Sequence, residues 1–460
     1  MLEGITANLV TRIMKAAPRF ELGIKDLQSS ALPLGHAADE KFIYTDNNFN
    51  RKDTHSLLII CNGHGEDVIA LEIIRRFLIS NKFQKIEVMP LVGNGYIFDT
   101  LKNKNFKKIG HLKLLPSGGF SNQSLISFIL DLMAGMLTEV LKNLQITRLK
   151  AKEKYKILAI GDFLPLFFAW SSKCDFGFIG TPKSDYTWSS GPGWSLSDFY
   201  HRLKGSEWDP WEILIMKNIR CKTVIMRDEI TAHNLNKKKI EAKFLGNPMM
   251  DLIDNDESLK FFKQDRYQKI MLLIGSRYPE AFNNFESFLS CLVQLNTNKK
   301  YLILLPLTMN ANVKKIEKLL IIHQFIKDKK KKFLIGEKSI WRKNNLFLLL
   351  GSGTFNSWVK IADVGLSNAG TATEQIAGLG IPSLSLPGKG PQFTKSFARR
   401  QQRLLGGCVR VCTSKKDLIE NLYILLENKK ARNEQGQIGI SRMGISGASK
   451  KIVDYLNFKL

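Results

Sequence analysis

The chain has 460 residues, which is long for a single hydrophobic core and favours two domains. Lysine and arginine give it a net charge of +26, so we expect a polyanionic neighbour such as a membrane surface or nucleic acid, although single lysine runs also occur on solvated faces. Six cysteines without a C-x-x-C pair exclude a disulfide scaffold and fit a reducing cytoplasm.

The hydropathy pattern argues against a membrane-spanning helix. Such a helix needs an apolar stretch of about 18 residues or more, and no uncharged stretch of that length occurs. The nearest candidate is residues 124–141, which contain Asp131 and Glu139. We interpret it as an amphipathic or buried helix.

Residues 1–52 stand apart from the rest of the chain. They share no sustained periodicity with it, and they lack the basic start, apolar middle and small-residue cleavage site of a secretory signal. Residues 18–38 resemble the peptide obtained when a transfer-RNA gene is translated. We therefore expect residues 1–52 to be a poorly ordered or spurious extension.

The first predicted domain spans residues 53–245 and alternates strands with helices. Residues 56–61 read SLLIIC, a continuous apolar run typical of a buried parallel strand. Further strands are predicted at residues 86–90, 156–160, 176–179 and 223–226. This alternation predicts an open parallel α/β sheet, which binds ligands beyond the C-terminal ends of its strands. The sequence NGHGED at 62–67 and the pair Gly161 and Asp162 fall at such ends.

Residues 181–211 interrupt the alternation. They combine Gly, Pro, Ser and aromatic residues without a period, and they include Trp188, Trp194, Trp208 and Trp211. A long loop of this composition predicts a lid or a binding loop. Anchoring of an irregular insert in the core by these rings is the alternative.

The second predicted domain spans residues 246–440 and is entered through a linker at 245–269. Its strands are predicted at residues 270–274, 301–305, 346–350, 364–366 and 383–386. Residues 441–460 are predicted to end the chain in a helix, on which Ile452, Tyr455 and Leu456 share one face.

A strand, a glycine turn and a helix follow one another from residue 364 to residue 379. Small residues occupy 367–370, and Ile376 and Leu379 share a helical face. A helix start reached through such a turn presents free backbone N–H groups and a partial positive charge, so it holds phosphate well. Thr371 and Glu374 also have the T-x-x-E spacing of a capping box, and both interpretations can hold together.

Residues 362–406 resemble the donor-nucleotide site of GT-B glycosyltransferases, and their GTAT turn is similar to that of lipid-A-disaccharide synthase. The fuller string, with TEQ, GLG-P, PG-GPQF and FA-x-x-Q-x-R-L-L-G, is closer to cyanobacterial-type proteins related to that synthase. LGNPMMD at 245–251 and IGSRYPE at 274–280 are similar to the G-[HN]-P-x-x-D and G-S-R-x-x-E of the family. The resemblance covers residues 56–458. It implies the GT-B fold, in which two Rossmann-like domains face each other across a cleft and the C-terminal helix crosses back to the first.

The resemblance also implies a donor site for a UDP-sugar. The residues expected at the diphosphate are Ser276, Arg277, Ala369, Gly370, Thr371 and Thr373. An arginine suits this role because its planar fork matches phosphate oxygens. Glu374 is expected at the ribose hydroxyls, Gln392 and Gln402 at the donor sugar, and the backbone of residues 351–355 at the uracil. No metal ion and no cofactor are expected.

A sugar transfer needs a base to remove the proton of the acceptor hydroxyl. His64 titrates near neutrality and suits this task, and Asp67 and Asp162 are its rivals. The family has G-E-x-S-G-D and D-x-P-x-F where this chain has NGHGED and GDFLPLF. This departure leaves the base unassigned among the three residues, and it leaves the acceptor open.

The implied activity is transfer of a hexosyl unit of the N-acetylglucosamine type from a UDP-sugar to a lipid-linked acceptor at the cytoplasmic membrane face, with lipid A biosynthesis as the context. The basic surface and the apolar helix expected at residues 124–141 would hold the chain peripherally to that membrane. A UDP-sugar 2-epimerase is one alternative, since Glu66, Asp67 and His64 would serve its acid–base chemistry equally well. A basic lipid-binding protein without turnover is another. Nucleic acid is disfavoured because aromatic residues are not interleaved with the basic runs, and the oligomeric state stays open.

Overall fold

The computed structural model describes residues 55–63, 65–110, 136–190, 196–253, 266–295, 298–308, 311–328, 334, 336–388, 390 and 393–460. The expectations for residues 1–52, His64, Trp194 and Gln392 lie outside these residues, as does most of the helix expected at 124–141. Within the described part of the chain, no helix combines the length and the apolar character needed to cross a bilayer.

The first sheet has seven strands in the order β3-β2-β1-β4-β5-β6-β7, and every pairing is parallel. Its strands are β1 (Leu57–Cys61), β2 (Ile86–Pro90), β3 (Phe106–Lys108), β4 (Lys156–Gly161), β5 (Phe176–Gly180), β6 (Cys221–Met226) and β7 (Ala242–Lys243). The strand order reverses between β1 and β4, which is the point where such sheets bind ligands. The sequence predicts the five longer strands. It does not predict β3 and β7, because segments this short carry too little pattern.

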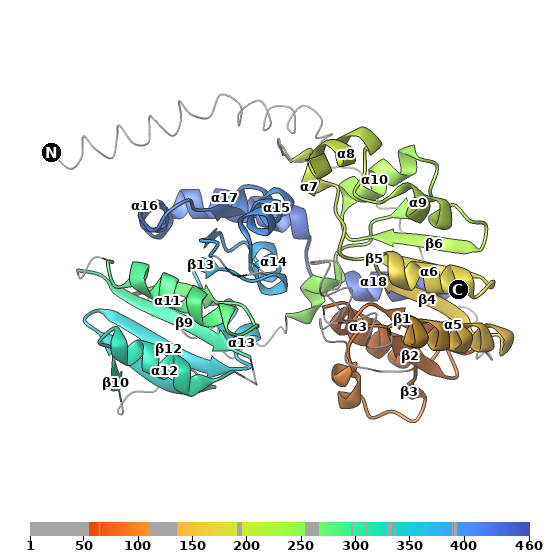
Figure 1. Cartoon of the computed structure of the whole chain (residues 1–460), viewed down its shortest axis with the longest axis horizontal. Helices are drawn as coiled ribbons and strands as arrows, with labels where there is room; N and C mark the ends of the chain where they lie inside the picture. Colours follow the sequence, from red (N-terminus) through yellow and green to blue (C-terminus); the bar gives the residue numbers. More distant parts are fainter. Residues whose placement is uncertain are drawn as a thin grey trace, which may run out of the picture. The chain divides into compact units, whose positions relative to one another are not determined.

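Helices cover both faces of this first sheet (Figure 1). This part of the chain contains η1 (Tyr96–Thr100), α3 (Gly65–Ser80), α5 (Met136–Lys152), α6 (Phe163–Ser171), α7 (Tyr186–Ser189), α8 (Leu196–Lys204), α9 (Pro210–Met216) and α10 (Glu229–Lys237). Side chains alternate along a strand. Leu57 and Ile59 therefore pack with α3, whereas Leu58 and Ile60 pack with α6. We call this sheet and its helices the N-terminal lobe.

Residues 181–211 are not the irregular loop that their composition predicts. They contain α7, α8 and the start of α9, which opens with Pro210 and a capping box between Asp209 and Glu212. Trp208 is fully buried and packs edge-on against Phe178, with 5.5 Å between ring centroids. One tryptophan of this insert is therefore a core anchor.

The second sheet has the order β10-β11-β12-β9-β8-β13-β14-β15. Its strands are β8 (Tyr267–Leu273), β9 (Lys300–Leu307), β10 (Ile326–Asp328), β11 (Glu337–Lys343), β12 (Leu346–Ser352), β13 (Val364–Ser367), β14 (Ser383–Ser385) and β15 (Val409–Val411). The strands from β12 to β15 pair in parallel, and β10 and β11 extend the edge as an antiparallel pair. The sequence does not predict this edge, because its segment is rich in lysine and lacks a long apolar run. The strand order reverses between β8 and β13.

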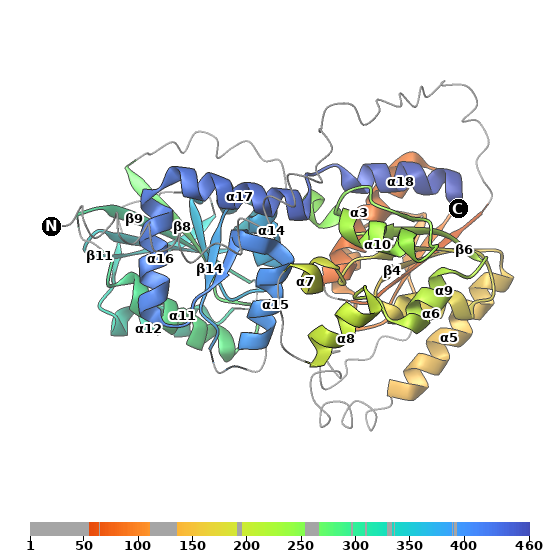
Figure 2. The ribbon, with the colours of Figure 1, turned by 90° about the horizontal axis from the view of Figure 1, so that it is seen from above.

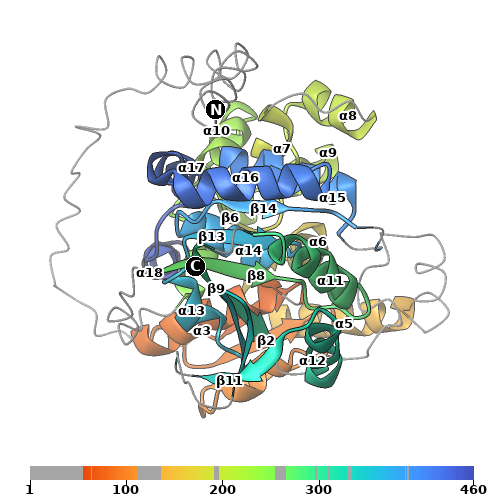
Figure 3. The ribbon, with the colours of Figure 1, turned by 90° about the vertical axis from the view of Figure 1, so that its left-hand side faces the viewer.

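Helices also cover both faces of the second sheet. We call this sheet and the helices that cover it the C-terminal lobe. The remaining helices are η3 (Pro248–Leu252), α11 (Glu280–Leu292), α12 (Val313–Ile322), α13 (Phe355–Val359), α14 (Thr371–Gly378), α15 (Lys395–Leu405), η5 (Gly406–Cys408), α16 (Lys415–Glu427), α17 (Lys429–Met443) and α18 (Ala448–Lys459). Ile270 and Leu272 of β8 pack with α11, α12 and α16, and α11 and α12 lie next to each other (Figure 3). Met271 and Leu273 belong to the opposite layer, with α14 and α17.

The C-terminal helix α18 leaves the second lobe and packs against α3 of the first (Figure 2), which confirms the predicted crossing. The helix before it, α17, stays with α14 in the C-terminal lobe. Gly444 ends α17 at a φ of 76° and Gly447 precedes α18 at a φ of 104°, so the crossing helix begins later than residue 441. Asp251 accepts hydrogen bonds from the backbone N–H groups of Gly447 and Ser449 and so fixes the start of α18.

Candidate functional site

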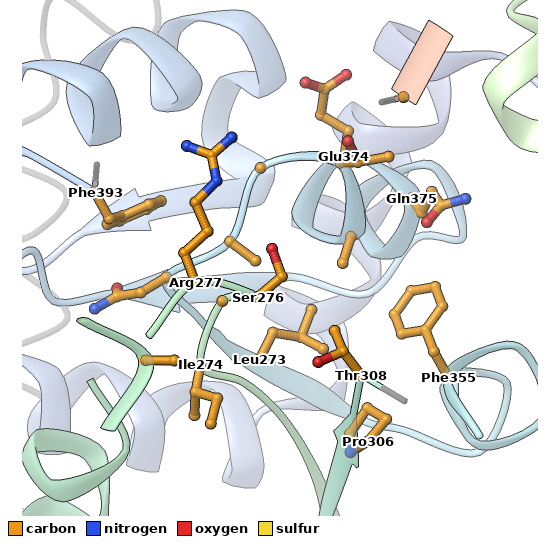
Figure 4. A pocket seen from close by; sticks show the side chains of 18 of the residues that line it. Leu273, Ile274, Ser276, Arg277, Pro306, Thr308, Phe355, Glu374, Gln375 and Phe393 are labelled. Atoms are coloured by element: carbon orange, nitrogen blue, oxygen red, sulfur yellow. The ribbon is translucent and has the colours of Figure 1, made fainter. Parts of the chain in front are cut away.

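A cavity of about 870 Å³ lies at the strand ends of both sheets. The N-terminal lobe lines it with the first turn of α3 and with the loops that follow β5 and β6. The C-terminal lobe lines it with the loops that follow β8, β9, β12 and β13 (Figure 4). β1 and β8 each border the switch point of their sheet, where this kind of sheet binds its ligands. The start of α3, which follows β1, and the loop after β8 line the same cavity.

A side chain of α15 forms hydrogen bonds with the turn between β13 and α14. Gln401 donates from Nε2 to the carbonyl oxygens of Ala369 (3.0 Å) and Gly370 (3.1 Å). Thr373 Oγ1 donates to the carbonyl of Ala369 at 2.6 Å. With their carbonyls engaged, Ala369 and Gly370 line the cavity together with Thr371 at the start of α14. A helix start carries unpaired N–H groups and a partial positive charge, so this wall suits an anion.

The capping box suggested by T-x-x-E does not form. The N-cap of α14 is Gly370, and the helix has no side-chain cap. Glu374 pairs instead with Arg227. Thr373 is fully buried and shares a 2.5 Å hydrogen bond with Ser367, so it supports the turn and does not line the cavity.

Three strand ends of the C-terminal lobe are tied together by two buried asparagines. Asn284 donates to the carbonyl of Ile274, after β8, at 3.0 Å, and accepts from Asn368 at 3.0 Å. Asn368 also exchanges hydrogen bonds with the backbone of Leu386, after β14. Because buried amides with all partners satisfied rigidify a loop, this network fixes the cavity floor. Neither residue belongs to a motif that marks the site in the sequence.

Ser276 and Arg277 follow β8 and both line the cavity, as Figure 4 shows. Ser276 is exposed and Arg277 is half-buried. Burial lowers the pKa of Arg277, and Glu280 opposes this. Glu280 itself is buried and accepts a 2.7 Å hydrogen bond from the backbone N–H of Phe393. The last residue of the G-S-R-x-x-E motif therefore holds the chain just before α15.

An ion pair between a buried arginine and a partly buried glutamate joins the two lobes at the cavity wall. Arg227, after β6, donates from Nη2 to Oε2 of Glu374 at 2.7 Å. Arg227 also donates from Nη1 to the carbonyl oxygen of Thr181 at 3.1 Å. Burial alone would lower the pKa of Arg227, but Glu374 and Asp228 outweigh it and raise the pKa. Glu374, expected at a ribose, thus already has a cationic partner from the other lobe.

Glu66 brings a titratable carboxyl group into the cavity from the first turn of α3. Burial raises its pKa to about 7, a backbone hydrogen bond opposes the rise, and nearby carboxylates, chiefly Asp162, add to it. Gly161, at a φ of 137°, ends β4 close by, since a Cβ there would lie 3.6 Å from Cγ of Glu66. A carboxyl group with this pKa exchanges a proton readily near neutral pH.

The two aspartates expected as bases do not line this cavity. Asp67 is buried and accepts a hydrogen bond from the thiol of Cys61 at 3.0 Å. Asp162 caps α6 by accepting from the N–H of Leu164 at 3.2 Å. Glu66, which the sequence suggests only for the epimerase alternative, lines the cavity in their place.

Gln402, which is expected at the donor sugar, does not line the cavity. Its Oε1 accepts from the backbone N–H of Val411 at 3.1 Å, whereas its neighbour Gln401 faces the turn before α14. Successive helix residues point about 100° apart, so only one of the two can face that turn. Of the expected uracil segment 351–355, Gly353 and Phe355 line the cavity. Among the described residues, no three or more His, Cys, Asp or Glu side chains are grouped to hold a metal ion.

No protein-family model matches the chain. No curated protein matches its sequence. Solved structures do match it in shape, each over 88% of this chain. They include a UDP-GlcNAc 2-epimerase from Methanocaldococcus jannaschii (TM-score 0.51, 16% identity, 99% of that chain covered), the calicheamicin glycosyltransferase CalG4 (0.54, 11%, 98%) and a UGT transferase from Siraitia grosvenorii in complex with UDP (0.53, 10%, 99%). At such identities the likeness establishes the fold. The chain has the GT-B fold, with two Rossmann-like lobes.

Proposed function

We propose that this chain is a UDP-sugar-dependent hexosyltransferase that passes a sugar of the N-acetylglucosamine type to a lipid-linked acceptor. The observation that carries the proposal is a cavity that residues at the strand ends of both lobes line together. Its C-terminal wall combines the start of α14 with Arg277, which suits a diphosphate. Its N-terminal wall supplies Glu66, which suits proton transfer to or from a sugar or its acceptor.

In the proposed reaction, the acceptor oxygen bonds to the anomeric carbon of the donor as the bond from that carbon to the diphosphate oxygen breaks. The acceptor proton passes to Glu66, and the electron pair of the broken bond leaves with UDP. Negative charge then grows on the diphosphate, where the helix start of α14 and Arg277 stabilise it. With a pKa of about 7, Glu66 is ionised in a large share of molecules at neutral pH and can act as the base.

A membrane-bound acceptor is supported by exposed apolar side chains on α8 and α9. Those more than half exposed are Phe199, Leu203, Trp211 and Leu214, which we call the α8/α9 apolar surface. The hydroxyl of Tyr200 contacts Asp209 at 3.3 Å and so joins the two helices. Aromatic and aliphatic side chains on a strongly basic protein favour the surface of an anionic membrane, and we propose peripheral binding there, on the cytoplasmic face.

The activity is tested by offering radiolabelled UDP-sugars together with a total lipid extract. We expect a lipid-soluble labelled product and release of UDP, and a rate lowered at least about 100-fold in Glu66→Gln, because a general base contributes on this scale. Glu72→Gln is the matched control, since Glu72 lies on the same helix and pairs with Arg76 outside the cavity. Absence of both product and UDP release with every donor would rule out the transferase.

A UDP-sugar 2-epimerase is the second candidate, favoured by the carboxylates gathered around Glu66. Epimerisation at C2 requires removal and return of a proton, and Glu66 and Glu374 both line the cavity. UDP-N-acetylglucosamine incubated alone in D₂O would then give a soluble epimer labelled with deuterium at C2. If neither reaction occurs while the protein still binds lipid vesicles, the protein is a lipid-binding protein without turnover.

A further inference from the structure

Arg227 is a cation held almost entirely out of solvent by three elements. Its residue is 4% exposed, its Nη1 bonds the carbonyl of Thr181 after β5, and its Nη2 bonds Glu374 of α14. The same Nη2 lies 3.6 Å from Sδ of Met443 at the end of α17. Since a buried arginine is costly unless it is paired, its position at the wall of a ligand cavity calls for an explanation.

The other member of the pair creates an electrostatic problem for the proposed donor site. Glu374 lies in the first turn of α14, the turn that the proposed diphosphate would contact. A carboxylate there stabilises the helix through its dipole but repels a bound anion, and this repulsion is strong where water is excluded. An uncompensated Glu374 would therefore weaken the binding of a diphosphate.

We propose that Arg227 is a positioning residue of the donor site, which neutralises Glu374 and thereby allows a nucleotide diphosphate to occupy the start of α14. The inference rests on the proposed function, because it assumes that a UDP-sugar binds in this cavity. It adds a residue from the N-terminal lobe to a site that sequence motifs place wholly in the C-terminal lobe. The hydrogen bond to one carboxylate oxygen, Oε2, also fixes the direction in which Glu374 points.

If the ion pair of Arg227 and Glu374 were purely structural, the expected effects of breaking it would differ. Breaking a structural pair would reduce stability and weaken uridine and UDP alike. Charge compensation acts on the diphosphate alone. The ratio of UDP affinity to uridine affinity therefore separates the two, because uridine has the same base and ribose but no phosphate.

The experiment is isothermal titration of UDP and uridine into the full chain, with variants Arg227→Gln, Glu374→Gln and the double variant. We expect the affinity ratio to fall about tenfold or more in Arg227→Gln, to rise above the wild-type value in Glu374→Gln, and to return near it in the double variant. Arg403→Gln is the matched control. Arg403 also joins the lobes, through Thr187 and Asp198, but does not line the cavity. Its ratio should stay at the wild-type value.

Circular dichroism reports whether each variant folds. If Arg227→Gln does not fold, the other two variants test the inference. The ratio of UDP affinity to uridine affinity should then rise in Glu374→Gln and return to near the wild-type value in the double variant. A ratio unchanged in all of the variants, or a double variant no better than Arg227→Gln, overturns the inference and leaves the donor site standing. Wild-type protein that binds neither UDP nor UDP-sugars removes the proposed function, and the inference with it.

Discussion

Gly65 and Thr371 face each other at the starts of α3 and α14, since a Cβ added to Gly65 would stand 3.6 Å from the hydroxyl oxygen of Thr371. Both residues line the cavity. Each helix start carries a partial positive charge, so two helix dipoles point at the same space. The cavity is narrow at this point and favours an anion from both sides.

Gly65→Leu should close this gap. A separation of 3.6 Å accepts a methyl group, so Gly65→Ala should bind UDP like the wild type, whereas a leucine side chain would reach across to Thr371. Both substitutions favour a helix over glycine, so neither should lower the melting temperature. We expect UDP affinity, measured by titration calorimetry, to fall at least about tenfold for leucine alone. If Gly65→Leu bound UDP with unchanged affinity, UDP would not bind between the starts of α3 and α14.

Glu66→Gln should change stability in a pH-dependent way. The pKa of Glu66 is raised from 4.5 to about 7, so the folded protein holds this proton more tightly than the unfolded chain does. Ionisation of Glu66 therefore costs stability as pH rises through this window, by about 3 kcal/mol once it is complete. The variant should be more stable than the wild type near pH 8, and the difference should shrink near pH 5. Urea unfolding at both pH values measures this, and an equal difference at both would contradict the raised pKa.

Gln401→Ala and Gln402→Ala form a matched pair on one helix. Gln401 holds the carbonyls of the turn before α14, so its loss should weaken UDP binding about tenfold by loosening that turn. Gln402 bonds Val411 outside the cavity, and its loss should leave UDP affinity within about twofold of the wild type. Titration calorimetry compares them. A larger loss for Gln402→Ala would restore the role expected from the sequence.

The α8/α9 apolar surface should control membrane binding. Replacing Phe199 and Leu203 together by serine removes apolar area that a membrane would bury, so co-sedimentation with vesicles rich in anionic phospholipid should fall several-fold. The control replaces Ile321 and Ile322 of α12 by serine, since these are also exposed but lie in the C-terminal lobe. Equal losses in both double variants would show that this surface has no special role.

The strands that position the cavity could be predicted because they are buried on both faces. Runs such as the one in β1 stay apolar throughout, and this signal does not depend on the rest of the chain. The hairpin of β10 and β11 could not be predicted in this way. It lies at a sheet edge, and within the two strands themselves only Ile340 and Trp341 are buried.

The residues of the candidate site were harder to predict than the strands. The motifs point to turns that line the cavity, but which of two neighbouring residues faces it depends on helix orientation, as with Glu66 and Asp67. Helix orientation likewise decides which of Gln401 and Gln402 contacts the turn before α14. Arg227 belongs to no glycine turn or spaced motif, and the role that we propose for it rests on a contact with Glu374, which lies far along the chain. Such a contact exists only after both lobes have folded.

The return of α18 to the N-terminal lobe sets an order for folding during synthesis. Ile452, Val453 and Leu456 complete the apolar layer over α3, yet they are synthesised only after the whole C-terminal lobe. Until then, that side of the N-terminal lobe lacks its contacts with α18, which exposes apolar surface and favours aggregation or chaperone binding. We therefore expect nascent chains arrested before Gly444 to stay sensitive to protease throughout the N-terminal lobe.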